Sequence, residues 1–127
     1  MLLLDSHVLL WAIRDNPRLG PGSREAIAAA VGVHVSAASI LELTIKSMLG
    51  KLTINENFAS RLVAQGFVPL AVTTEHAEGI RDFPELIKHD PFDRLLVSQA
   101  HRTGLRLLTA DRVLLSLKRD FIIDATV

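Results

Sequence analysis

Four acidic residues stand where carboxylates can do chemistry: Asp5, Glu42, Asp93 and Asp111. Asp5 and Asp111 each follow a short apolar run, Glu42 lies in an otherwise apolar helical segment, and Asp93 lies in the first turn of a predicted helix. In open parallel sheets ligands bind beyond the carboxyl ends of the strands, so Asp5 and Asp111 would share a crevice if their strands are neighbours. Clustered carboxylates repel one another unless cations lie between them, and such hard oxygen ligands suit Mg²⁺ or Mn²⁺. Two ions about 4 Å apart can hold the attacking and leaving oxygens of a phosphodiester displacement.

Each acid also has a purely structural interpretation. The two acids that follow apolar runs can serve as N-caps, and Glu42 can pair with Lys46 one turn later. In the segment DPFD, Asp90 at N-cap, Pro91 at N1 and Asp93 at N3 resemble a capping box. Capping, however, does not require the four carboxylates to converge on one place. Their convergence at one edge of a sheet therefore separates the two interpretations.

Other catalytic signatures are missing from the chain. It contains no GxGxxG, GxxxxGK[ST] or GxSxG motif, and with no cysteine and no HExxH it offers no competing zinc site. The five histidines are scattered without ligand spacing. Among them His7, two residues after Asp5, is nearest to the predicted crevice.

The elements that would position these acids alternate between short apolar runs and helical patterns. Strands are predicted at 2–4, 33–35, 67–72, 105–108 and 121–123. Helices are predicted at 8–13, 23–30, 36–49, 55–65, 91–103 and 113–117, with a further short helix from residue 74. Ser23 and Asn55 are the predicted N-caps of the second and fourth of these helices. Residues 82–90 are predicted to be an irregular linker. This alternation predicts an α/β three-layer sandwich, in which helices flank a mostly parallel central sheet of about four to five strands.

Composition limits the class of protein further. The chain has 127 residues, 49% of them hydrophobic, with 14 Lys and Arg against 14 Asp and Glu. We expect one domain over residues 1–127, built without disulfides because there is no cysteine. Aromatic residues at 5% disfavour a base-stacking platform. The N-terminus lacks a signal-peptide pattern and no stretch approaches the ~18 apolar residues of a membrane span, so we expect a cytoplasmic protein without membrane contact.

Charge is distributed unevenly although the net charge is zero. Residues 75–93 carry six acids and two bases, a net charge of −4, whereas residues 94–119 carry six bases and one acid, a net charge of +5. An acidic stretch beside a basic one suits a metal site next to a phosphate-binding surface, and it also suits two solvated faces.

Four ordered segments resemble the PIN domain family, and within it the small toxin-like branch called VapC-type. These segments are LLLDSHVLLW, VSAASILELTIKSMLGKL, HDPFDRLLVSQA and LLTAD, and together they cover nearly the whole chain. The resemblance implies that Asp5, Glu42, Asp93 and Asp111 are the metal-binding acidic quartet. Asp93 is preferred to Asp90 for this role because it directly precedes RLLVSQA.

The resemblance also implies roles for residues around the quartet. Ser6 and Thr109 would orient the carboxylates through their hydroxyl groups. Asp90 would act as a helix cap or as an outer acid. Basic side chains would meet RNA phosphates, with Arg94, Arg102, Arg106 and Arg112 as candidates.

The resemblance implies a metal-dependent endoribonuclease that uses Mg²⁺ or Mn²⁺ and leaves 5′-phosphate and 3′-hydroxyl ends. It further implies the toxin of a type II toxin–antitoxin pair, with an antitoxin that blocks the acidic crevice. A homodimer is expected, with the Leu-rich first helix as a source of apolar contact area.

Two alternatives stay open at this point. The first is a catalytically silent PIN module that binds RNA or a protein, against which the intact acidic quartet argues. The second is an aspartate-based phosphotransferase of the haloacid dehalogenase or receiver kind. The dehalogenase pattern needs a second Asp two residues after the first, and here His7 occupies that position.

Overall fold

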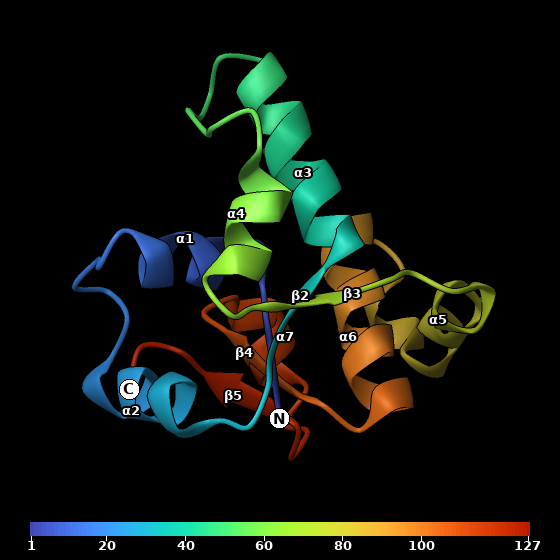
Figure 1. The fold of residues 1–127 in the computed structure, drawn as a ribbon. Coiled ribbons are helices and arrows are strands. Elements are labelled where there is room, and N and C mark those ends of the chain that lie inside the picture. The colour runs from blue at the N-terminus through green and yellow to red at the C-terminus, as the bar shows by residue number, and fades with distance from the viewer.

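Five parallel strands form the central sheet of the computed structural model, which describes residues 1–127 (Figure 1). The sheet order is β3-β2-β1-β4-β5, where the strands are β1 (Leu2–Leu4), β2 (Val33–Ser36), β3 (Val68–Leu70), β4 (Arg106–Thr109) and β5 (Ile122–Asp124). The chain builds outward from β1 to β3 on one side and then returns to place β4 on the other side of β1. The predicted mostly parallel α/β sheet is confirmed.

Helices cover both faces of this sheet, as expected for buried parallel strands. They are α1 (Ser6–Ile13), α2 (Pro21–Ala29), α3 (Ala37–Met48), α4 (Phe58–Ala64), α5 (Thr74–Glu78), α6 (Pro91–Thr103) and α7 (Arg112–Ser116), with 3₁₀ turns at Gly79–Asp82 and Pro84–Leu86. No helix is long and apolar enough to cross a membrane.

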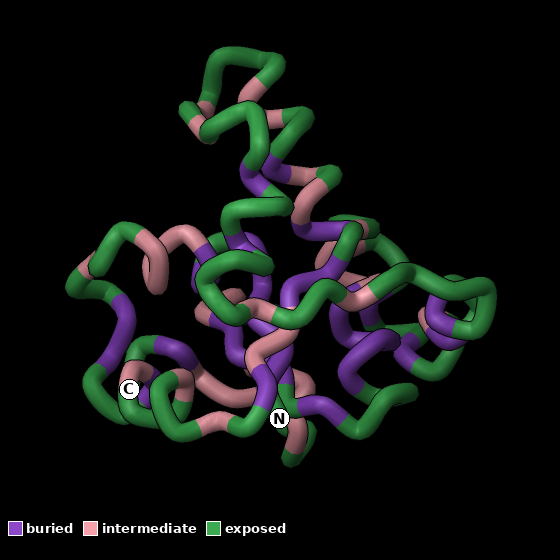
Figure 2. The backbone as a smooth tube through the Cα atoms, in the orientation of Figure 1, coloured by how far each residue is buried: buried purple, intermediate pink, exposed green.

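Alternate side chains of β1 and β4 enter two separate hydrophobic clusters, because successive strand residues point to opposite faces. Leu3 and Leu107 pack under α6 on one face, while Leu4 and Leu108 pack against α1 and α3 on the other. Figure 2 shows the buried segments gathered along the central strands, with the outer half of α3 and the loop after it largely exposed.

Two predicted helix N-caps and one predicted linker are wrong. Helix α2 begins at Pro21 with Gly20 as N-cap, because the Ser23 hydroxyl instead donates a hydrogen bond to the carbonyl of Val127, 3.0 Å away. Helix α4 begins at Phe58 with Asn57 rather than Asn55 as N-cap.

The third correction concerns residues 82–90, which are not an irregular linker. The 3₁₀ turns there bury Phe83 and Leu86 at 2% and 1% exposure in the cluster under α6. This segment therefore contributes to the core, and it delivers the chain to the start of α6.

Candidate metal and catalytic site

The pairing of β1 with β4 brings distant acids together at one edge of the sheet. Leu4 lies opposite Leu108, so the residues that follow, Asp5 and Thr109, lie side by side at the carboxyl ends of the two strands. This is where the strand order reverses, the usual position of ligand sites in open α/β sheets. A pocket of about 450 Å³ opens there, and we call it the acidic pocket. It is lined by Asp5, His7, Trp11, Glu42, Lys46, Asp90, Asp93, Ala110 and Asp111.

Asp5 is buried and holds two bonds at once. Its Oδ1 accepts a hydrogen bond of 2.8 Å from the backbone N–H of Val8, which caps α1, and its Oδ2 accepts one from the Thr109 hydroxyl. Thr109 Oγ1 in turn accepts the N–H of Asp111 at 3.1 Å, so Thr109 links the two acids. Burial raises the pKa of Asp5 above its ordinary value. The capping role and the pocket position therefore occur in the same residue.

Glu42 reaches the acidic pocket from α3. Its Oε1 accepts a 2.6 Å hydrogen bond from the Ser6 hydroxyl, and its Oε2 lies 3.0 Å from the Nζ of Lys46. The Lys46 pair that the spacing predicts is thus present, and Ser6 holds the carboxylate from the opposite side.

Asp90 and Asp111 both cap helices. Asp90 Oδ1 accepts the N–H of Phe92 at 2.8 Å at the start of α6, and Asp111 Oδ1 accepts the N–H of Val113 at 2.9 Å at the start of α7. The carboxylate of Asp93 completes no capping box with Asp90 and turns toward Asp111 instead. Capping accounts for Asp90 but leaves the position of Asp93 unexplained.

The concentration of negative charge shows most clearly at Asp93. Burial, followed by the charges of Asp111, Asp90, Asp5 and Glu42, raises the pKa of Asp93 from 3.8 to about 7. Lys46 is the one lysine or arginine side chain that lines the pocket. A donor set of carboxylate oxygens with so little compensating charge fits a hard divalent cation. Asp5, Glu42, Asp93 and Asp111 are the residues that would hold it.

His89 is a residue beside the pocket that sequence reasoning missed. Its Nε2 lies 3.3 Å from Oδ2 of Asp93 and 3.3 Å from Oδ2 of Asp111. The only sequence signal was the four-residue spacing between His89 and Asp93 in HDPFD. His7 does line the pocket, with an exposed side chain.

The four candidate arginines do not form one surface. Arg102 lies nine residues after Asp93, about 13 Å along α6, and its guanidinium pairs with Asp82 at 3.1 Å. Arg106 begins β4, so it lies at the opposite end of that strand from Thr109. Arg112 is exposed directly after Asp111, and Arg94 directly follows Asp93. Arg94 and Arg112 alone are therefore adjacent in sequence to acids of the pocket.

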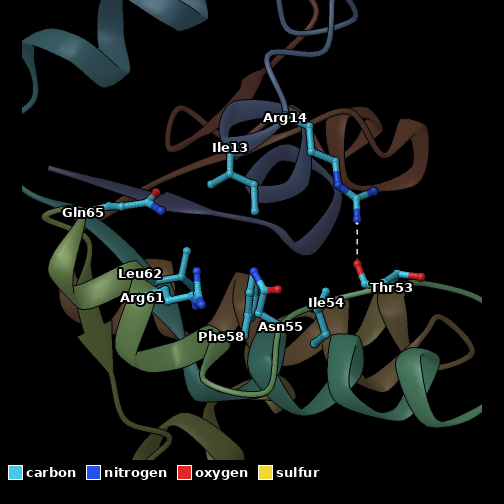
Figure 3. A pocket seen from close by; sticks show the side chains of 9 residues that line it. All are labelled: Ile13, Arg14, Thr53, Ile54, Asn55, Phe58, Arg61, Leu62 and Gln65. Carbon is cyan, nitrogen blue, oxygen red and sulfur yellow. Dashed lines mark hydrogen bonds between the residues drawn. The ribbon is translucent and has the colours of Figure 1, made fainter.

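A second pocket, of about 280 Å³, lies between the end of α1 and α4 (Figure 3). Arg14 and Arg61 are among its lining residues, and Arg14 donates a 3.0 Å hydrogen bond to the carbonyl of Thr53. No carboxylate lines this pocket, so it cannot serve as the cation site.

The predicted homodimer contact through the first helix stays a prediction, and α1 leaves little apolar area free for it. Val8 and Leu9 are buried within the cluster on this face, and the remaining apolar side chains of α1 pack against the same cluster. Exposed apolar side chains lie on and after α3 instead, at Leu41, Ile45, Met48 and Leu49.

Comparison with known proteins is consistent with this geometry. The family model described as PIN domain matches residues 2–119. The chain belongs to the PIN domain family. This PIN domain is 32% identical over 122 residues to Ribonuclease VapC22 of Mycobacterium tuberculosis, an alignment that covers 91% of this chain and 90% of the relative.

Solved structures show the same PIN fold at lower identity. A chain of VapBC2 from Rickettsia felis, bound to a DNA fragment from the promoter, has a TM-score of 0.66 at 17% identity and covers 96% of this chain and 95% of that one. A chain of DNA-bound VapBC from Salmonella typhimurium has a TM-score of 0.64 at 19% identity, with coverages of 97% and 96%.

Replacing Thr109 by valine in this PIN domain tests the link between Asp5 and Asp111. Valine keeps the side-chain shape but removes the hydroxyl that bonds both residues. We expect initial cleavage rates on labelled RNA to fall about 10- to 100-fold, as for other groups that orient ligands. Thr103→Val is the control, because that hydroxyl bonds only the carbonyl of Gln99 on the far part of α6. Full activity of Thr109→Val would contradict the role.

The crowded carboxylates predict a pH-dependent stability of the metal-free protein. Because the pKa of Asp93 is raised from 3.8 to about 7, the folded state keeps a proton that the unfolded chain has already released. Stability must therefore fall as pH rises through this window and level off above it.

The Asp93→Asn substitution should reduce the fall of stability with rising pH and should raise the melting temperature at pH 8. Solvent screens the charge of this partly exposed group. We therefore expect the free energy of unfolding to rise by roughly 1 kcal/mol, or the melting temperature by about 3 °C. Thermal melts in chelator between pH 4 and pH 8 measure it, with exposed Asp120→Asn as the control. Equal slopes in wild type and Asp93→Asn would refute it.

Proposed function

We propose that this chain is a toxin endoribonuclease that hydrolyses RNA phosphodiester bonds with Mg²⁺ or Mn²⁺, as a single nuclease domain over residues 1–127. One observation carries the proposal: four carboxylates from four separate segments line one pocket at the carboxyl ends of β1 and β4. The relationship to Ribonuclease VapC22 supports the reaction class. Capping and surface solvation do not require this convergence.

The protein's own groups have distinct tasks in this proposal. Asp5, Glu42, Asp93 and Asp111 bind the cation, which when bound supplies a water-derived nucleophile at neutral pH and offsets charge on the scissile phosphate. The remaining groups keep these carboxylates in place. Thr109 fixes Asp5, Ser6 and Lys46 fix Glu42, and the α7 amides fix Asp111.

RNA is proposed to approach along the exposed rim of the acidic pocket. Arg112 is exposed beside Asp111 and is the best placed of the four candidate arginines to meet a phosphate. Arg94 is the second choice, because it is half-buried and its Nε lies among protein atoms. Arg102 is the weakest candidate because Asp82 already holds its guanidinium.

The proposed partner is an antitoxin protein. Two solved relatives are VapBC complexes, and the net negative pocket favours an inhibitor that presents a basic side chain to the carboxylates. A homodimer and a cytoplasmic location stay predictions. For the homodimer, the exposed apolar side chains of α3 are the surface to examine.

Cleavage of a mixed set of labelled RNAs tests the proposed function. Purified protein is incubated with tRNA, rRNA fragments and single-stranded RNA in Mg²⁺, Mn²⁺ or EDTA. We expect metal-dependent cutting that EDTA abolishes and that leaves 5′-phosphate ends. Folded, inhibitor-free protein that cuts nothing with either metal would instead favour the catalytically silent module.

The structure argues against the phosphotransferase alternative. Asp5 is buried and both its oxygens already accept hydrogen bonds, so it is poorly placed to attack phosphorus. Residue 7, where the dehalogenase pattern needs an acid, is an exposed histidine.

A further inference from the structure

His89 occupies a position that neither capping nor core packing explains. It follows the 3₁₀ turn Pro84–Leu86 and precedes the N-cap of α6, and its backbone N–H donates a 2.9 Å hydrogen bond to the carbonyl of Leu86. Its side chain lies beside Asp111, which follows β4. The side chain is 20% exposed, but its Nε2 atom is buried.

Nε2 of His89 lies close to one carboxylate oxygen each of Asp93 and Asp111. Nε2 lies 3.3 Å from Oδ2 of Asp93 and 3.3 Å from Oδ2 of Asp111, yet neither oxygen is aligned with the ring nitrogen well enough for a hydrogen bond. The three candidate ligand atoms lie within 4.8 Å of one another. A buried ring nitrogen that makes no hydrogen bond is uncommon and calls for an explanation. A cation shared by the three atoms would satisfy it.

We propose that His89 Nε2 is a nitrogen ligand to a divalent cation that Asp93 and Asp111 also bind. The inference rests on the proposed function and deepens it, because it turns an all-carboxylate site into a mixed nitrogen and oxygen site. The acidic quartet that the resemblance implies contains no histidine, so the imidazole adds a ligand to that set. Asp5 and Glu42 are held in the same pocket by hydroxyl groups and Lys46.

A nitrogen ligand changes which metals the site prefers. Mg²⁺ favours oxygen ligands almost exclusively, whereas imidazole suits the later divalent transition metals, whose affinity rises from Mn²⁺ to Co²⁺ and Ni²⁺. The His89→Asn protein should therefore lose Co²⁺ affinity by about 10- to 100-fold while its Mg²⁺ affinity changes less than about 3-fold. Calorimetric titration of the full chain with each metal alone measures this difference without any RNA.

Mn²⁺ bound to the protein gives a direct spectroscopic test. Pulsed electron paramagnetic resonance detects a ¹⁴N nucleus coordinated to Mn²⁺, and ¹⁵N-histidine labelling changes that modulation. His7 is the matched control, because it is a histidine that lines the acidic pocket together with Asp93 and Asp111. We expect nitrogen modulation in the wild type and in His7→Asn, and its loss in His89→Asn with Mn²⁺ still bound.

The other outcomes separate this inference from the proposed function. Mn²⁺ that binds without nitrogen modulation, or with modulation lost in His7→Asn, overturns the role of His89 and leaves the nuclease proposal standing. A wild-type protein that binds no divalent metal overturns both. If His89→Asn does not fold, the labelled wild-type and His7→Asn spectra still decide between the two histidines.

Discussion

RNA cleavage by the Asp5→Asn protein is expected to fall at least about 100-fold below the wild-type rate, more than for groups that only orient ligands. The reason is the loss of one carboxylate from a pocket whose other acids come from α3, α6 and the start of α7. Initial rates on a labelled RNA that the wild type cuts, in Mg²⁺ and in Mn²⁺, measure the effect.

The fold should survive this substitution, which makes it a clean test of chemistry. Asparagine is as good an N-cap as aspartate, so it can still accept the N–H of Val8. It also removes a carboxylate whose pKa is raised by burial. The melting temperature of the metal-free Asp5→Asn protein should equal or exceed that of the wild type.

Asp120→Asn serves as the control, because Asp120 is exposed between α7 and β5 and lies outside the acidic pocket. It should cut at the wild-type rate. Retained cleavage in folded Asp5→Asn would refute the assignment of the quartet.

The largest expected effect on stability comes from Leu4→Ala. Leu4 is fully buried in β1, directly before Asp5, and packs in the cluster that contains Leu9 and Leu108. Truncation leaves a cavity in a core that cannot fully collapse, at a cost of about 2 to 5 kcal/mol in free energy of unfolding. That loss is a large part of the roughly 5 to 15 kcal/mol that holds a typical domain folded.

Chemical denaturation of wild type and variant measures the loss, with Leu41→Ala as the matched control. Leu41 lies on α3 and is 53% exposed, so its truncation should change stability by less than about 0.5 kcal/mol. Similar midpoints for Leu4→Ala and wild type would show that β1 does not depend on this packing.

Local signals in the sequence were sufficient for most of the fold. Apolar runs of three or four residues ended by capping residues predicted the strands, because buried parallel strands are apolar on both faces. Pro91 and Gly104 marked the ends of α6 through backbone constraints of their own, and Gly104 adopts the left-handed conformation at φ 70°. The chemical types of Asp5, Glu42, Asp93 and Asp111 also predicted a cation site before any geometry was known.

Other features depend on partners that are distant in the chain. Ser23 bonds to residue 127 rather than to its own helix, and the residues around Phe83 fold as part of the core. Arg102 pairs with Asp82, twenty residues earlier. No local sequence pattern predicts these contacts, because each side chain contacts the group that the tertiary fold places opposite it.

The sequence by itself therefore determined which elements form and which residue types are available for chemistry. Only the tertiary structure determined which of these residues lie together. Thr109 bonds to Asp5 across 104 residues, and Ser6 bonds to Glu42 across 36. It also placed His89 between Asp93 and Asp111. The physical reason is that capping and hydrophobic periodicity act within a few turns of chain, whereas the pairing of β1 with β4 and the packing of α3 and α6 bring the carboxylates together.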